Sequence, residues 1–401
     1  MRRTKGEGSI YKDEAKGLYV FQFTYVDKTT GKQCRKKLYG KTKKAVKQAQ
    51  EIFLEELEQK YKEYYGNAAS LDVVVGQDIK ATSCLSKWLY YWLDNVKKQS
   101  IAVKTYERYR SYVSCNLDNS IGQKAINTIT PFQFQEFFKD LRLHGGKNHQ
   151  GIAPRTINSI RQMLKQSYTD AINFGLLVKN PLTSTKALST EPTKMHVITK
   201  EQANKLISVA LRHSRFQWII IVLALETGMR IGEIFGLEWS NINFEKKTLL
   251  VEKTVVSTTK GKLIKPIGKN KFSRRTINLS DHTIESLKRF KLWLKAASIK
   301  TGCSYDKSNW LLPNPKGEPR SPNSFTSHKF KDLLAEAGID NAFRVHDMRH
   351  THATLLLEAG VNVKVVSERL GHASTRITLD LYAHVLKTMQ AAAVDALNKM
   401  F

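Results

Sequence analysis

Two arginines, two histidines and a tyrosine in the second half of the chain are of the types that cleave a phosphodiester without a metal. Arg230 lies in Thr-Gly-Met-Arg, His346 and Arg349 share His-Asp-Met-Arg-His, and His372 and Tyr382 follow. Negative charge grows on the non-bridging oxygens in the transition state, so cationic donors must surround the phosphate. Arginine suits this role because its planar fork donates two hydrogen bonds and stays charged. The remaining types supply a nucleophile and a proton donor.

Each of these residues, taken alone, has an ordinary structural explanation. A lone arginine after Thr-Gly is usually a salt-bridge partner, and a lone tyrosine near a C-terminus usually belongs to the core or the surface. His346 and His350 have the helical spacing of a zinc pair, and with Asp347 they approach the metalloprotease pattern His-Glu-x-x-His. Aspartate is one methylene shorter than the glutamate general base, and a basic chain suits that enzyme poorly. We therefore expect no metal site here.

The charge of the chain indicates a polyanionic partner. Its 401 residues include 65 Lys and Arg against 36 Asp and Glu, a formal net charge of +29. Such an excess can serve nucleic acid, an anionic membrane surface or solubility alone. A membrane surface would require a basic amphipathic helix or a polybasic tail beside a lipid anchor, and the sequence has neither. Basic residues recur along most of the chain, which favours several domains on one nucleic acid.

Other classes of protein are disfavoured by what the sequence lacks. The longest apolar stretch, residues 218–225, is far short of the roughly 20 residues that span a bilayer. The N-terminus has no apolar core behind its charges, so we expect no signal peptide and a cytoplasmic protein. The four cysteines are far apart and form no Cys-x-x-Cys pair, which disfavours a zinc ribbon or a disulfide framework.

The elements that must position these residues fall into several domains, since 401 residues exceed one ordinary domain. Segments 9–11, 18–26 and 34–40 are rich in aromatic and β-branched residues and predict a three-stranded sheet. A charged helix with an apolar stripe begins at Thr42. Basic strand faces can read a DNA groove or can simply protect the edges of a solvated sheet. We place this first domain at residues 1–65.

A helical domain is predicted next, at residues 82–185, after a linker at 65–81. Thr130-Pro131 is typical of an N-cap followed by proline at the first helical position. Pro154 opens a further helix, which is expected to continue to Phe174. Its lysines and arginines fit a clamp on a duplex, although each alone is more often a solvated surface charge.

The largest domain is predicted at residues 195–401, after a second linker. Thr199 and Gln202 form a capping box that begins a helix. Alternating segments at 248–251, 262–264 and 276–279 interrupt the helices and predict one small inserted sheet. The fold class is therefore multidomain and mainly α with small β parts, ending in a mixed α/β domain.

This last domain resembles the catalytic domain of the tyrosine recombinases, the phage integrase family. The family's fingerprint is Thr-Gly-x-Arg-x-x-Glu, a hairpin lysine, His-x-x-Arg, Gly-His and a tyrosine, in that order. The matching positions here are Arg230 with Glu233, Lys269, His346 with Arg349, Gly371-His372 and Tyr382. Each piece alone is weak, but the full set in order is specific. The resemblance covers residues 195–401.

The resemblance implies a catalytic role for each matching residue. Tyr382 would attack the scissile phosphate, form a 3′-phosphotyrosyl link and release a 5′ hydroxyl. Arg230, Arg349 and His372 would hold and neutralise the phosphate, and His346 would assist proton transfer. The covalent intermediate keeps the bond energy, so no ATP, divalent metal or other cofactor is implied. Separately, residues three apart on a helix face each other, so we expect Glu233 to orient Arg230.

The hairpin lysine has more than one candidate. The family's lysine often lies in Pro-Lys-Thr-Lys ahead of Ser-x-Arg, whereas this chain reads Pro-Ile-Gly-Lys-Asn-Lys-Phe-Ser-Arg-Arg over residues 266–275. Alignment on Ser273-Arg274-Arg275 puts Lys269 in the catalytic place, where it would protonate the leaving oxygen. Lys271 and Lys265 are the alternatives.

The two preceding domains fit the same family. The helical segment resembles its core-binding domain. The first segment resembles the three-stranded arm-binding domain of integrases from temperate phages and conjugative transposons, which the shorter Xer-type recombinases lack. The resemblance implies integration and excision of a mobile element through a Holliday junction in the bacterial cytoplasm. Its implied partners are double-stranded DNA with core and arm att sites, four protomers in a homotetramer, an excisionase and a DNA-bending host protein.

Two other functions are compatible with parts of the sequence. A non-catalytic DNA-binding protein could keep the fold, but it would not need Arg230, Arg349, His372 and Tyr382 together. A type IB topoisomerase-like enzyme would share the tyrosine chemistry without a partner site. The arm-binding-like segment favours site-specific recombination over that alternative.

Overall fold

The structure is a computed structural model. It describes residues 9–14, 17–26, 33–70, 75, 76, 78–146, 148–191, 195–267, 273–326, 329–376, 378, 379, 398 and 400, with the side chains of residues 58 and 60–70 left out. The predictions for Lys269, Lys271 and Tyr382 lie outside the described residues. The chain divides into two compact units, Met1–Glu191 and Pro192–Phe401.

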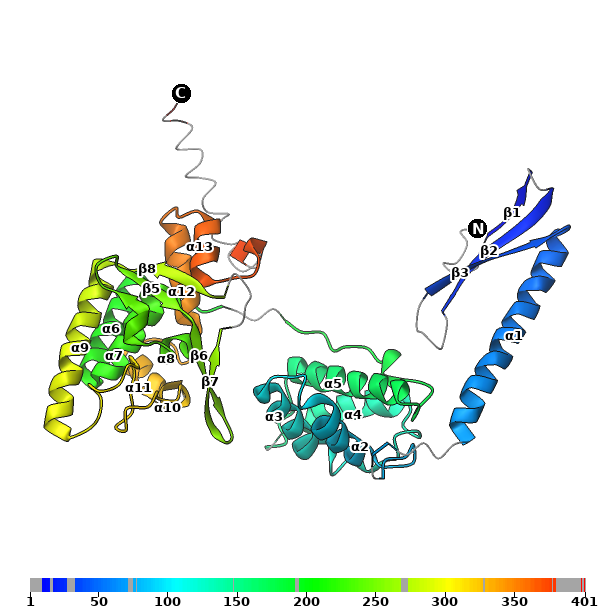
Figure 1. Cartoon of the computed structure of the whole chain (residues 1–401), viewed down its shortest axis with the longest axis horizontal. Helices are drawn as coiled ribbons and strands as arrows, with labels where there is room; N and C mark the ends of the chain where they lie inside the picture. Colours follow the sequence, from blue (N-terminus) through cyan, green and yellow to red (C-terminus); the bar gives the residue numbers. More distant parts are fainter. Residues whose placement is uncertain are drawn as a thin grey trace. The chain divides into compact units, whose positions relative to one another are not determined.

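The first unit begins with the predicted three-stranded antiparallel sheet, in which β2 lies between β1 and β3 (Figure 1). Phe21 of the central strand pairs with Ile10 on one side and with Leu38 on the other. One face of the sheet is covered by the helix that follows, and Phe21, Phe23 and Val46 are buried between them. The elements are β1 (Ser9–Asp13), β2 (Leu18–Val26), β3 (Gln33–Gly40) and α1 (Lys43–Ser70).

The helix α1 is longer than the sequence predicts. It continues to Ser70, so the first residues of the predicted linker at 65–81 are helical. Gly66 does not end the helix, because a glycine inside a helix costs only about 1 kcal/mol relative to alanine. The residues after it, Asn67, Ala68 and Ala69, continue the helix without a proline.

A helical body follows in the same unit, as predicted. Thr130 caps α4 through a capping box with Gln133, and Pro131 is the first helical residue. The core includes the fully buried Trp92 and Tyr168, whose polar atoms donate to the Asp170 carboxylate and the Ile126 carbonyl. The helices are α2 (Leu85–Tyr91), which continues with wider π-type turns in η1 (Trp92–Lys97), α3 (Val103–Tyr112) continued by η2 (Val113–Leu117), η3 (Ile121–Gln123), α4 (Pro131–His144), α5 (Pro154–Asn173) and η4 (Pro181–Thr183).

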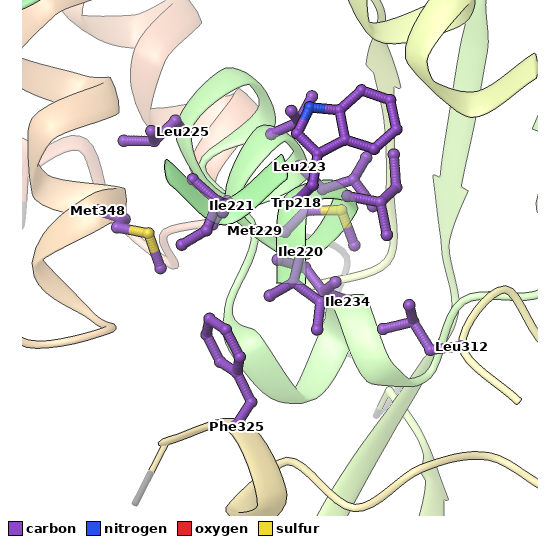
Figure 2. Close-up of a cluster of buried hydrophobic side chains, with 14 of the residues drawn as sticks. Trp218, Ile220, Ile221, Leu223, Leu225, Met229, Ile234, Leu312, Phe325 and Met348 are labelled. Atoms are coloured by element: carbon purple, nitrogen blue, oxygen red, sulfur yellow. The ribbon is translucent and has the colours of Figure 1, made fainter. Parts of the chain in front are cut away.

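The second unit is built around one buried helix. The helix α7 is apolar on nearly all sides and packs against α6, α9 and α12. Figure 2 shows its side chains meeting Phe325 of α10 and Met348 of α12. The predicted capping box of Thr199 and Gln202 begins α6. The helices are α6 (Lys200–His213), α7 (Arg215–Thr227), α8 (Ile231–Phe235), η5 (Trp239–Asn241), α9 (Asp281–Thr301), α10 (Asn323–Thr326), α11 (Lys329–Ala337), α12 (Asp347–Glu358) and α13 (Val363–Leu370).

The strands of this unit form two sheets, so the prediction of one inserted sheet is wrong. A three-stranded sheet has the order β4-β5-β8, and β6 and β7 form a separate hairpin. Alternation predicts β5, β7 and β8 but misses β4 and β6, and it does not encode which strands pair when the chain turns between Val251 and Lys253. The strands are β4 (Ile242–Asn243), β5 (Thr248–Val251), β6 (Lys253–Thr258), β7 (Gly261–Pro266) and β8 (Arg275–Asn278).

Candidate active site

Gly228 ends α7 and directs the chain toward Arg230. Its backbone is left-handed, with φ 65°, a conformation that glycine adopts without steric cost. A Cβ atom at this position would lie 2.5 Å from Cδ2 of His352, so only glycine fits between α7 and α12. The turn makes Arg230 the residue that precedes α8.

Glu233 fixes Arg230 by both its backbone and its side chain. The Glu233 carboxylate accepts the Arg230 backbone N–H at 3.0 Å and its Nη1 at 2.9 Å. Glu233 is 4% exposed, whereas the Arg230 side chain is 43% exposed. The guanidinium is therefore held from the protein side and can still reach a ligand in solvent.

Arg349 joins the ends of two helices. It is buried in α12, and its Nη1 and Nη2 donate to the carbonyls of Gly228 at 2.8 Å and Leu370 at 2.7 Å. These carbonyls belong to the turn before Arg230 and to the end of α13, just before His372. Arg349 thus links the two segments that carry the other predicted phosphate-binding residues.

His372 follows the left-handed Gly371 that ends α13. Its Nδ1 lies 2.8 Å from Oγ1 of the buried Thr378, which holds the half-buried ring in place. Desolvation, followed by the positive charges of Arg349 and Arg230, lowers the pKa of His372 to about 4. The ring is therefore neutral at pH 7.

His346 precedes α12 and lies beside His350. Their rings are 5.0 Å apart, centroid to centroid, and nearly perpendicular. Desolvation lowers the pKa of His346 to about 4, with further contributions from His350, Arg349 and Arg230. His346 keeps an exposed edge and is neutral at pH 7, so it can accept a proton.

The structure brings together the five predicted site residues that it describes. Arg230 and Arg349 both lower the pKa values of His346 and His372, so the two arginines act on both rings. Glu233 joins these residues through its contacts with Arg230. Lys269 and Tyr382 lie outside the described residues. Lys265, an alternative hairpin lysine, pairs with Thr254 in the β6-β7 hairpin.

Sequence reasoning missed the contribution of Arg275, which it used only to align the hairpin. Arg275 is buried and forms a salt bridge of 2.8 Å with Glu233. Burial on its own would raise the pKa of Glu233, but the hydrogen bond and charge of Arg275, together with Arg230, hold it below its usual value. Arg275 and Ile277 lie on the same, buried face of β8. A charged residue on that face is a signal that a buried partner exists.

Neither a metal cluster nor a membrane span is found in the part of the chain that the structure describes. No group of three or more His, Cys, Asp and Glu side chains there has the arrangement of a metal site. Asp347, between the paired histidines, instead accepts from Arg344 at 2.8 Å. No described helix is both long and apolar enough to cross a bilayer.

Two family models match the chain. The phage integrase family matches residues 196–389, and the N-terminal SAM-like domain of phage integrases matches residues 84–142. A tyrosine recombinase XerC-like protein of Caldanaerobacter subterraneus subsp. tengcongensis is 29% identical, over 98% of this chain and 98% of its own. The transposase from transposon Tn916 of Enterococcus faecalis is 26% identical, over 77% of this chain and 76% of its own.

The fold is similar to that of solved integrases. The Tn1549 transposon integrase in complex with a circular intermediate DNA matches with a TM-score of 0.64 and 20% identity, over 79% of this chain and 99% of that one. Together, the fold, the arginine–histidine site and the matches define an enzyme that cuts and rejoins DNA at specific sites. The chain belongs to the phage integrase family of tyrosine recombinases.

Proposed function

We propose that the protein is the integrase of a mobile element and that Tyr382 is its nucleophile. The observation that carries this proposal is that Arg349 binds the Gly228 and Leu370 carbonyls and so joins the segments that carry Arg230 and His372. Two fixed cations beside two neutral imidazoles supply the charge and the proton acceptor that cleavage of a phosphodiester needs. Tyr382 follows these residues in the order typical of the family.

The chemistry proceeds by transesterification. The Tyr382 oxygen attacks the phosphorus as its proton passes to His346, and the bond from phosphorus to the 5′ oxygen breaks. Lys269 protonates that oxygen, and His346 assists the proton transfers. The 5′ hydroxyl of a second strand then attacks the 3′-phosphotyrosine, restores the phosphodiester and returns the proton to the tyrosine. The number of phosphoester bonds is unchanged, so no ATP is consumed.

Arg230, Arg349 and His372 bind the non-bridging oxygens in this scheme. Arginine can donate two parallel hydrogen bonds to a phosphate, and both guanidinium groups are already oriented by Glu233 and by two backbone carbonyls. A site that is organised before the substrate arrives does not have to reorganise during the reaction. Glu233 acts as the orienting residue.

The three predicted domains then divide the binding of DNA. We assign residues 1–65 to arm-type sites, 82–185 to the core site and 195–401 to catalysis. In the helical domain, Arg108 of α3 and Arg155 of α5 line one pocket together with Tyr109, Asn158 and Gln162. Two arginines from different helices at one pocket suit the backbone of a duplex.

The assembly that follows from this assignment is a homotetramer on two DNA sites. Two successive strand exchanges, with a Holliday junction between them, integrate and excise the element. The Tn916 transposase and the Tn1549 transposon integrase favour a conjugative transposon as that element. An excisionase and a DNA-bending host protein are the further partners that we propose, and the substrate places the reaction in the bacterial cytoplasm.

The decisive experiment uses a nicked suicide duplex that carries the core site of the encoding element. We expect the full-length protein to form a covalent adduct on a denaturing gel, and Tyr382→Phe to form none. Tyr305→Phe is a matched control in the same domain and should form the adduct normally. An adduct that persists in Tyr382→Phe would show that another residue is the nucleophile.

A further inference from the structure

Arg275 is a buried arginine that touches the site without a place in the chemistry proposed above. Its side chain is 6% exposed and lies at the start of β8. Nη2 and Nη1 donate to the two carboxylate oxygens of Glu233, at 2.8 Å and 3.4 Å. The same two oxygens accept from Arg230. Glu233 is therefore held from one side while it holds Arg230 on the other.

The same guanidinium also binds the end of α13. Its Nε donates to the Arg369 carbonyl at 2.7 Å, and its Nη1 donates to the Ser273 carbonyl at 3.2 Å. The last carbonyls of a helix have no partner within that helix. Here the consecutive carbonyls of Arg369 and Leu370 accept from Arg275 and Arg349, respectively. The chain then passes Gly371 to His372.

The connection between β8 and α13 runs in both directions. The Arg369 side chain donates back to the Asn278 carbonyl at the end of β8, at 2.9 Å. It also donates to the Glu226 carbonyl near the end of α7 at 2.9 Å and to Nε2 of His352 in α12 at 3.2 Å. Two arginines thus lock the strand, the helix before His372 and the helix before Arg230 together.

We propose that Arg275 is a positioning residue that holds Arg230, through Glu233, and His372, through the end of α13, in one fixed arrangement. The proposal rests on the function proposed above. A lysine could not replace it, because one ammonium group cannot match the planar fork that serves a carboxylate and two carbonyls at once. Nη1 of Arg275 also holds the carbonyl of Ser273, two residues before Arg275 itself.

The first test measures cleavage of the nicked suicide duplex by full-length Arg275→Met under single-turnover conditions. A misplacement of about 1 Å can cost a reaction about 100-fold, so we expect cleavage to slow by about 10- to 100-fold. Affinity for the duplex should change less than about threefold, because the buried Arg275 side chain has no exposed surface with which to bind a phosphate. Wild-type rates for Arg275→Met would overturn the proposal.

The matched control is Arg320→Met. Arg320 is half-buried in the same domain, donates to the Pro313 carbonyl at 2.8 Å and lies 3.9 Å from the Phe216 ring centroid. Its loss should lower the melting temperature without slowing cleavage at temperatures where both variants are folded. Equal slowing in Arg320→Met and Arg275→Met would make the effect of Arg275 a general loss of stability and would contradict the proposal.

A second variant covers the case in which Arg275→Met does not fold. Arg275→Lys keeps a positive charge beside Glu233 but cannot also hold the Arg369 carbonyl. We expect it to fold and to cleave at least about tenfold more slowly than the wild type. Wild-type cleavage by Arg275→Lys would overturn the proposal, because a point charge would then suffice.

The pH profile separates positioning from packing. Among the described residues, the charged groups that face Glu233 are Arg230 at the start of α8 and Arg275 in β8, with His372 near both. Without Arg275, burial raises the pKa of Glu233, and protonated Glu233 no longer orients Arg230. As the pH is lowered, the cleavage rate of Arg275→Met should therefore begin to fall at a higher pH than the rate of the wild type. A profile that matches the wild type contradicts the proposal.

The double variant Glu233→Gln/Arg275→Met identifies the group that titrates. Glutamine does not ionise, so the additional fall in cleavage at acid pH should disappear even though the rate stays low. If the fall persists, a histidine causes it and the proposal fails. Failure of the proposed function is distinct from these outcomes, because the wild-type protein itself would then form no covalent adduct.

Discussion

The carboxylate of Glu233 accepts two hydrogen bonds from Arg230, one from its backbone N–H at 3.0 Å and one from its guanidinium at 2.9 Å. The acid is buried, and the arginine is partly exposed. Such a contact fixes the direction of the guanidinium and leaves part of it exposed for the phosphate that we propose it binds. The spacing Arg-x-x-Glu in the sequence therefore allows Glu233 to orient Arg230 in the candidate site.

Glu233→Gln should therefore impair cleavage more than binding. The substitution leaves Arg230 poorly oriented and leaves Arg275 buried without a counter-charge, which costs about 3–5 kcal/mol of folding stability. We expect cleavage of the suicide duplex to slow by about 10- to 100-fold, with affinity in a filter-binding assay nearly unchanged. Glu318→Gln, which breaks the partly exposed pair with Lys262, is the control and should change neither quantity. Unimpaired cleavage by Glu233→Gln would refute the orienting role.

Arg230→Ala tests whether Arg230 acts in the transition state or only anchors DNA. A donor aimed at developing charge is worth about 100-fold or more in rate, whereas one lost phosphate contact weakens affinity far less. We expect the single-turnover cleavage rate to fall much more than the affinity for the duplex. Equal losses in the two measurements would mean that Arg230 is a phosphate anchor alone.

Thr378 should matter through His372. Its hydroxyl lies 2.8 Å from Nδ1 of His372 and is fully buried, so Thr378→Val keeps the shape and removes the partner. Loss of one hydrogen bond of about 1 kcal/mol predicts cleavage roughly fivefold to tenfold slower. Thr378→Ser retains the hydroxyl and should restore most of the rate. If valine and serine give equal rates, the hydroxyl does not position His372.

Gly228→Ala should be more damaging than the left-handed backbone alone explains. Its Cβ would lie 2.5 Å from the His352 ring and 2.8 Å from Cδ2 of Leu370. Gly302 ends α9 with φ 68° and has no atom within 4 Å of such a Cβ, so Gly302→Ala reports the backbone strain by itself. We expect about 1–2 kcal/mol for Gly302→Ala and about 2 kcal/mol more for Gly228→Ala in chemical denaturation. Equal losses of unfolding free energy in the two variants would show that α12 and α13 can move away from the added methyl group without cost.

Much of the fold is readable from local signals, as particular elements show. The strand predicted at residues 18–26 is β2 with the same bounds, and Thr130 and Thr199 cap the predicted helices. These features depend on residues within one turn or strand. Strand pairing does not, so the division into a three-stranded sheet and a separate hairpin was not predictable.

The candidate site, like the fold, was predictable only where local sequence patterns define it. Residues with a place in the family's motif could be named, including Glu233, which lies one helical turn from Arg230. Arg275 and Arg369 could not, because their contacts join β8 to α8, α13 and α7, segments that are distant in the chain. Only the phase of Arg275 along β8 hinted at a buried partner. The motif predicts which residues carry the chemistry, and contacts between segments distant in the chain fix the positions of those residues that the structure describes.

The buried histidines predict how stability depends on pH. Burial, together with the positive charge of Arg369, lowers the pKa of His352 from 6.5 to about 4, and Nδ1 of this ring lies 2.8 Å from the Leu225 carbonyl. Because the folded pKa is depressed, the unfolded chain binds the proton first. The contribution of His352 to stability is complete above about pH 6.5 and is lost as the pH falls toward 4, up to about 3 kcal/mol. His352→Gln should unfold with a shallower pH dependence over this interval in chemical denaturation. A slope identical to that of the wild type would show that His352 is not held neutral in the fold.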